Sequence, residues 1–156
     1  MANKRVLFVC TYKGARARIA EEFVKQYGAG KIDAFSSCFE AGKFGKLPIN
    51  VMDEIGIEIS NESPMSVFDR YAGKEVFDYV ISLCHEATVE LCPLFKVNID
   101  VLYQKDSERI SWSVQDFKSL KGTDEEKMEG ARGIRDNIKT EVISFLEKIG
   151  VKQVAI

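Results

Sequence analysis

Three features that mark other classes of protein are missing from this sequence. Its formal net charge is −2, so it lacks the basic excess that is typical of nucleic-acid-binding proteins. Its first apolar run, Val6 to Cys10, is too short for the core of a signal peptide, and no later run approaches the length of a membrane span. It has a single histidine, His85, and its cysteines lack the Cys-x2-Cys spacing of common zinc sites. We therefore expect neither nucleic acid nor a membrane as partner, no metal or other cofactor, and a cytoplasmic location.

The cysteine content points to thiol chemistry. Cys10, Cys38, Cys84 and Cys92 stand in a chain without a recognisable secretory signal, which is typical of reduced cytoplasmic thiols and not of a disulfide framework. With 156 residues, of which 46% are hydrophobic, the chain is long enough for one domain with a substantial core and short for two. We expect a single domain over residues 1–156.

Short apolar runs alternate with helical periodicity along the chain. Strands are predicted at 4–9, 32–37 and 77–83, with a weaker fourth strand at 101–103. Helices are predicted from Ala17 to Gly28, from Pro48 to Gly56, and after a capping box that starts at Thr123. Strands that alternate with helices favour right-handed crossovers and a parallel sheet covered on both faces. The predicted fold is therefore a three-layer α/β domain with a four-stranded parallel sheet flanked by helices.

A Cys-x5-Arg sequence lies where the first predicted strand meets the first helix. The backbone N–H groups at such a junction, together with the helix dipole, favour negative charge and lower the pKa of a thiol. They can also cradle a tetrahedral oxyanion, with the arginine holding two of its oxygens. Cys10 is the predicted nucleophile, with a buried structural thiol as the alternative. The predicted oxyanion-binding loop consists of Thr11, Tyr12, Lys13, Gly14, Ala15 and Arg16.

A second cysteine occupies a comparable place in the predicted sheet. Cys84 follows the third predicted strand as Cys10 follows the first. Ligands of open parallel sheets bind beyond the carboxyl ends of the strands. Cys10 and Cys84 are therefore candidates for one shared site.

Four pairs of segments, spread over residues 4–145, carry a resemblance to a known family. They are 6–16 with 20–21, 35–37 with 57–61, 78–84 with Cys92-Pro93, and 112–116 with 132–139. Together they resemble the low-molecular-weight protein tyrosine phosphatase superfamily, and within it most closely the thioredoxin-coupled arsenate reductases. The resemblance implies a phosphatase I-like fold.

The resemblance also implies a role for each of five residues. Cys10 attacks arsenate, Arg16 and the loop hold its oxygens, and Asp116 protonates the departing oxygen. Cys84 then attacks Cys10 and releases arsenite, and Cys92 attacks Cys84 to leave a disulfide that thioredoxin reduces. Phosphatases of the family need only the nucleophile, the arginine and the acid, so the two further cysteines favour the reductase branch.

Several positions depart from the family pattern. Lys13 stands where asparagine is usual, Ala17 where serine or threonine is usual, and Phe117 where proline is usual, while the loop glycine occurs two positions late. Family members often hold a potassium ion near this loop, and the matching positions are Lys13, Glu21 and Ser36. We expect the Lys13 ammonium to reach Glu21 and replace that ion as a supporting cation. A Lys13 that lies at the rim of the loop and attracts anionic substrate is the alternative.

Three functions are consistent with these residues. The leading one is arsenate reduction with thioredoxin as electron donor. The second is hydrolysis of phosphotyrosine through a phosphocysteine intermediate, and the third is a non-catalytic oxyanion-binding or redox-responsive protein. Cys84 and Cys92 could also be ordinary buried thiols, and Asp116 a loop carboxylate. Cys38 has no counterpart in the family pattern and is interpreted as a structural thiol.

Overall fold

The chain folds as alternating strands and helices, in a computed structural model that describes residues 3–84, 103 and 107–151. In chain order the elements are β1 (Lys4–Tyr12), α1 (Ala15–Gly28), β2 (Ile32–Glu40), α2 (Lys46–Asp53), α3 (Val67–Ala72), β3 (Tyr79–Cys84), β4 (Glu108–Ser113), the 3-10 helix η1 (Phe117–Ser119) and α5 (Asp124–Lys148).

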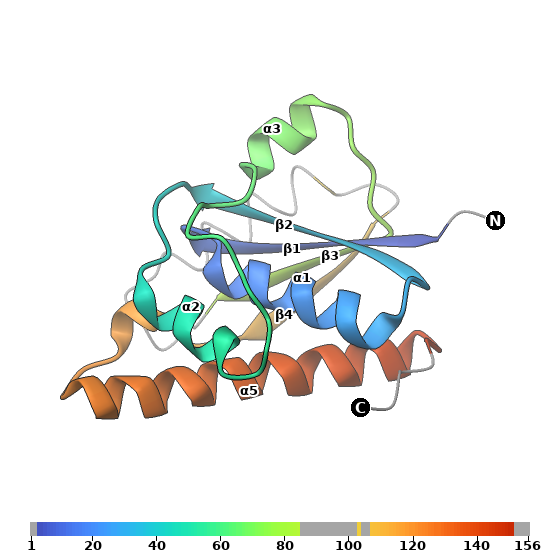
Figure 1. Ribbon diagram of the computed structural model, residues 1–156. Coiled ribbons are helices and arrows are strands. Elements are labelled where there is room, and N and C mark those ends of the chain that lie inside the picture. The colour runs from blue at the N-terminus through green and yellow to red at the C-terminus, as the bar shows by residue number, and fades with distance from the viewer. Residues whose placement is uncertain (1–2, 85–102, 104–106, 152–156) are drawn as a thin grey trace.

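The four strands form one parallel sheet in the order β2-β1-β3-β4. The register pairs Lys4 with Ile32 across β1 and β2, and Val6 with Tyr79 across β1 and β3. Because every pair is parallel, all the carboxyl ends meet at one edge of the sheet, on the side where α2 lies (Figure 1). The predicted four-stranded parallel sheet is confirmed.

The two faces of the sheet bury different sets of side chains. Val6 and Phe8 pack on the face that α1 and α5 cover, whereas Leu7 and Val9 pack on the other face with Val67 of α3. Figure 1 shows α3 on the side of the sheet opposite to α5. Successive residues of a strand point to opposite faces, so a run of apolar residues is what a strand covered on both faces requires. Among the described residues, no helix is long and apolar enough to cross a membrane.

The longest helix begins at the capping box that the sequence predicts. The Thr123 hydroxyl accepts a hydrogen bond from the Glu126 N–H at 3.1 Å, and the Glu126 carboxylate accepts one from the Thr123 N–H at 3.2 Å. This exchange satisfies two backbone donors that a helix start otherwise leaves open. The predicted start of the last helix is therefore confirmed.

The fourth strand and the helix α3 differ most from the sequence prediction. The fourth strand is Glu108–Ser113; Tyr103 lies in a turn, and the rest of the predicted strand, 101–102, lies outside the described residues. β4 is an edge strand in which only Trp112 is buried, so its sequence lacks the apolar run of the central strands. The six-residue helix α3 was not predicted, because so short an element carries little periodicity.

Candidate active site

β1 continues past Cys10, which changes the shape of the predicted loop. Tyr12 still pairs with Glu40 of β2, and the Lys13 N–H donates to the Glu40 carbonyl at 2.6 Å. The turn into α1 is therefore only Lys13 and Gly14, both with left-handed backbone, at φ 59° and 88°. A Cβ on Gly14 would lie 2.5 Å from Cδ of Pro64, so no larger residue fits there. The late glycine of the loop thus has a structural reason, while the prediction that the strand stops at residue 9 is wrong.

Cys10 lies fully buried on the face of the sheet that α1 covers. Its thiol is reduced, as is that of Cys38. Ala17, in the first turns of α1, is buried in the same cluster. The side chain at the predicted nucleophilic position is therefore part of the core between the sheet and α1.

The structure brings Arg16 and Asp116 together from distant parts of the chain. The Arg16 side chain is 1% exposed, and its Nη1 donates to the carbonyl oxygen of Val114 at 2.9 Å. Its Nη2 lies 3.9 Å from Oδ2 of Asp116, which partly compensates the buried charge. Asp116 also caps η1, where its carboxylate accepts a long hydrogen bond from the Lys118 N–H at 3.4 Å. The predicted anion-binding arginine and general acid thus form a pair.

A cavity of about 160 Å³ opens beside this pair. The charged and aromatic groups that line it are Lys13, Lys46, Lys118, Phe44, Phe117 and Asp116. Three ammonium groups around one carboxylate give the cavity a positive rim, which attracts anions. The two phenyl rings add flat apolar walls. Through this cavity an anionic group, with or without an attached aromatic ring, can approach Asp116.

Cys84 ends β3 on the other face of the sheet. It is 1% exposed and packs with Leu7, Val9 and Tyr103 on the face that α3 covers, and the Thr11 hydroxyl donates weakly to its Sγ at 3.9 Å. It is disulfide-bonded. Because Cys10 and Cys38 are both thiols, neither is its partner.

Cys92 lies outside the described residues, so its predicted role stays a prediction. Cys10 and Cys84 share the carboxyl edge of the sheet, as the sequence suggested, but they face opposite layers.

Lys25, and not the predicted Lys13, is the lysine that pairs with Glu21. The Glu21 carboxylate accepts from the Ser36 hydroxyl at 2.6 Å, and its second oxygen forms an ion pair with Lys25, one turn along α1. The structure does not bring Lys13 to Glu21. The Lys13 side chain packs against Gly42, where an added Cβ would lie 3.0 Å from its Cγ, and lines the cavity. The alternative of a lysine at the rim describes its position better.

Sequence reasoning missed some residues of this region. Lys25 was signalled by its spacing from Glu21, whereas Lys46, Lys118 and Phe44 carry no motif and join the cavity only through the fold. Within the described part of the chain, no cluster of three or more histidine, cysteine, aspartate or glutamate side chains could hold a metal ion.

Comparisons with known proteins match almost the whole chain to the family that its sequence resembles. Residues 5–155 match the family described as "Low molecular weight phosphotyrosine protein phosphatase". The arsenate reductase of Halalkalibacterium halodurans is 32% identical over 146 residues, which are 93% of this chain and 97% of the relative. The glutaredoxin arsenate reductase of Synechocystis sp. is 30% identical over 94% of this chain and 98% of its own length. Among solved structures, "An arsenate reductase in oxidized state" has a TM-score of 0.70 and 29% identity, and the match covers 94% of this chain and 99% of that one.

Proposed function

This chain belongs to the low molecular weight phosphotyrosine protein phosphatase family, and we propose that it is an arsenate reductase. The cysteines are the observation that favours arsenate reduction over phosphotyrosine hydrolysis. Cys84 at the end of β3 is disulfide-bonded, a state for which a phosphatase has no use but which a reductase must reach in every cycle. Relatives that match over nearly their full length bear the name arsenate reductase.

The first step that we propose is attack on arsenic. The Cys10 thiolate forms an S–As bond while an As–O bond breaks, and Asp116 gives the departing oxygen a proton, so that it leaves as water. Arg16 holds the remaining oxygens. Its proximity to Asp116, 3.9 Å from Nη2 to Oδ2, supports a site in which anion binding and proton donation occur side by side.

The second step transfers the electrons. The Cys84 thiolate attacks the Cys10 sulfur, an S–S bond forms, and the S–As electron pair stays on arsenic, which leaves as arsenite. Cys92 then attacks Cys84 and returns Cys10 to its thiolate form. Since Cys84 faces the α3 layer and Cys10 the α1 layer, this step requires the end of β3 to rearrange from the arrangement described above. We interpret the structure as the form that follows the relay.

The electron donor is a small dithiol protein or glutathione. We propose thioredoxin, because a protein disulfide formed by the two relay cysteines is a substrate for thiol–disulfide exchange with such a dithiol. One relative is named a glutaredoxin arsenate reductase, so the two donors have to be compared directly.

Phosphotyrosine hydrolysis is the second candidate, and one observation favours it. The cavity beside Asp116 has phenyl side chains, Phe44 and Phe117, on its walls. A flat aromatic ring on a phosphate ester would pack between or against such walls. This activity would use Cys10, Arg16 and Asp116 and leave Cys84 unused.

A coupled assay separates the two activities. NADPH oxidation through thioredoxin reductase and thioredoxin should depend on arsenate and on this protein, and Cys84→Ser should abolish it. The same protein is assayed with an aryl phosphate and with glutaredoxin plus glutathione in place of thioredoxin. Aryl phosphate turnover that survives Cys84→Ser, with no arsenate-dependent oxidation of either donor, would reject the reductase in favour of the phosphatase.

A further inference from the structure

Cys38 lies directly beside Cys10 in the sheet. The parallel register of β1 and β2 makes the two residues Cα partners, and both are fully buried. Partners in adjacent strands point to the same face, and here Ile32 and Ala34 of β2 share the cluster of Cys10. Because neighbouring strands are about 4.8 Å apart, the Cα separation falls in the range of about 4.4–6.8 Å that a disulfide requires.

Cys38 also lies beneath the turn that follows Cys10. A Cβ on Gly14 would lie 3.3 Å from Cβ of Cys38, and the Cys38 thiol contacts the Pro64 carbonyl at 3.6 Å. A reagent that reaches Cys10 therefore arrives next to a second thiol. By contrast, Cys84 faces the other layer of the molecule.

The surroundings of Cys38 keep its thiol protonated. Burial raises the pKa of the Cys38 thiol to about 11, and the neighbouring Cys10 charge adds to the rise, while a hydrogen bond with Ser63 lowers it. When Cys10 is converted to a neutral species, that repulsion disappears. Cys38 then becomes easier to ionise at the moment when a partner sulfur is available.

We propose that Cys38 is a resolving thiol for oxidised Cys10, so that a hydroperoxide converts the pair into a Cys10–Cys38 disulfide. The Cys10 thiolate attacks the peroxide, an S–O bond forms, the O–O bond breaks with release of hydroxide, which takes up a proton to become water, and Cys10 becomes a sulfenic acid. Cys38 then attacks that sulfur, an S–S bond forms, and the hydroxide leaves as water with the proton of Cys38. Two thiols lose two electrons, and hydrogen peroxide is reduced to water. The proposal shares with the proposed function only the nucleophilic character of Cys10.

The consequence is protection of the nucleophile. A sulfenic acid that meets no thiol is oxidised further to sulfinic acid, which dithiols do not reverse. A Cys10–Cys38 disulfide stops the sequence at a form that a dithiol reduces back to two thiols. Cys38 thus acts on damage to Cys10 and takes no part in the turnover of oxyanions.

The test is peptide mapping of the full chain without arsenate. Protein reduced with dithiothreitol and desalted is treated with a small excess of hydrogen peroxide, alkylated, digested and analysed by mass spectrometry. We expect a cross-linked peptide that joins Cys10 to Cys38, in the wild type and also in the Cys84→Ser/Cys92→Ser variant. In Cys38→Ser and Cys38→Ala we expect sulfinic acid at Cys10 and loss of most of the activity that dithiothreitol restores to the wild type.

Two results would overturn the proposal. One is a Cys38 that is alkylated in full in every oxidised sample, with Cys10 joined only to Cys84. The other is sulfinic acid at Cys10 forming at the same rate in wild type and both Cys38 variants, each shown to be folded by its thermal unfolding. Arsenate-dependent turnover of untreated Cys38→Ser, measured separately, tells a failure of this proposal from a failure of the proposed function.

Discussion

Asp116 is the single residue whose chemistry is easiest to isolate. Asp116→Asn keeps the size of the side chain and can still accept from the Lys118 N–H, but it has no proton to give. We expect kcat to fall by about 10²- to 10⁴-fold, the usual contribution of a positioned general acid. Steady-state kinetics with the substrate that the wild type turns over measures this effect.

The matched control is Asp124→Asn, which changes an exposed carboxylate in the first turn of α5. It should leave kcat unchanged. A normal kcat in Asp116→Asn would remove Asp116 from the mechanism.

Alanine variants of Gly14 and Gly30 distinguish the cost of a left-handed backbone from the cost of a steric clash. Both have left-handed φ, at 88° and 76°, but an added Cβ meets Pro64 at 2.5 Å only at Gly14 and nothing within 4 Å at Gly30. Gly30→Ala should cost about 1–2 kcal/mol of unfolding free energy, the price of the left-handed conformation alone. Gly14→Ala should cost clearly more, as measured by urea unfolding. Equal losses in the two variants would mean that the turn adapts to the methyl group.

Lys25 was not predicted as the partner of Glu21, although a contact within one helix is easier to predict than a contact across the turn. Glu21 and Lys25 are four residues apart, and that spacing alone places them side by side on α1. The direction of the Lys13 side chain depends on its left-handed φ of 59°. Such a conformation is uncommon for lysine, and no sequence pattern predicts it. The prediction of a Lys13–Glu21 pair therefore failed where the backbone is unusual.

At the scale of elements, one carboxylate joins α2 to two arginines of α5, beside the buried apolar contacts between the two helices. Glu54, just after α2, accepts from Arg132 at 2.8 Å and from Arg135 at 3.0 Å, and these contacts lower its pKa below the ordinary value of 4.5. The folded protein therefore holds this proton less tightly than the unfolded chain. The stabilisation is complete above about pH 4.5 and is lost as the pH falls through the lower folded value.

Glu54→Gln should accordingly lower the thermal unfolding midpoint at pH 7. The difference from wild type should shrink as the pH is lowered from about 5 to 3, since the wild-type carboxylate is then protonated. Glu58→Gln, an exposed glutamate in the next segment, is the control and should follow the wild type throughout. A Glu54→Gln deficit that persists undiminished in acid would assign the effect to packing.

The strands β1, β2 and β3 were predictable from the sequence, whereas β4 and α3 were not. β1 and β3 are buried on both faces and read as apolar runs, whereas β4 is polar at alternate positions and α3 has only six residues. The predicted starts of the first two strands, residues 4 and 32, are the residues that pair in the structure. Both strands were ended too early, at 9 and 37. The pairing of Cys10 with Cys38 lay one residue beyond each predicted end.

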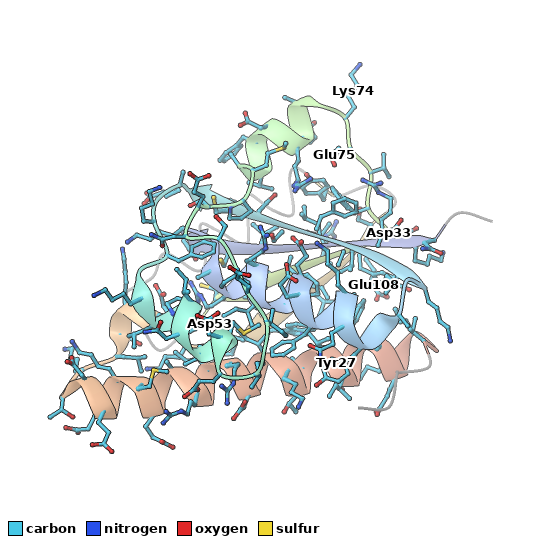
Figure 2. All side chains as sticks on the ribbon, in the orientation of Figure 1. Tyr27, Asp33, Asp53, Lys74, Glu75 and Glu108 are labelled. Atoms are coloured by element: carbon cyan, nitrogen blue, oxygen red, sulfur yellow. The ribbon has the colours of Figure 1, made fainter. Side chains whose placement is uncertain are left out.

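At the scale of the whole molecule, the three cysteines that the structure describes lie in two different layers. Cys10 packs in the layer between the sheet and the helices α1 and α5, Cys38 is its register partner on the neighbouring strand β2, and Cys84 packs in the layer under α3. Figure 2 shows Glu75 on the segment that leads from α3 back to the sheet, while Lys74 extends away from the molecule. Glu75 forms ion pairs with Arg70 of α3 and with Arg5 of β1, so α3 is fixed to the sheet by charge as well as by Val67.

The overall architecture followed from strand and helix patterns, but this division of the thiols did not. Strand ends give the edge of the sheet at which a residue lies, which is why Cys10 and Cys84 were expected together. The face of the sheet on which a side chain lies depends on the exact residue at which its strand begins, because successive side chains of a strand point to opposite faces. The cavity beside Asp116 likewise combines α2, the loop before it and η1, whose approach is set by packing over long sequence distances.

The most direct measurement of the central claim is a single turnover without any donor. Fully reduced protein is mixed with arsenate, and arsenite and remaining thiols are quantified. A reductase releases about one arsenite per chain and loses about two thiols, which mapping finds at Cys84 and Cys92, and in Cys92→Ser at Cys10 and Cys84. No arsenite and an unchanged thiol count, from protein that hydrolyses an aryl phosphate, would contradict the reductase assignment.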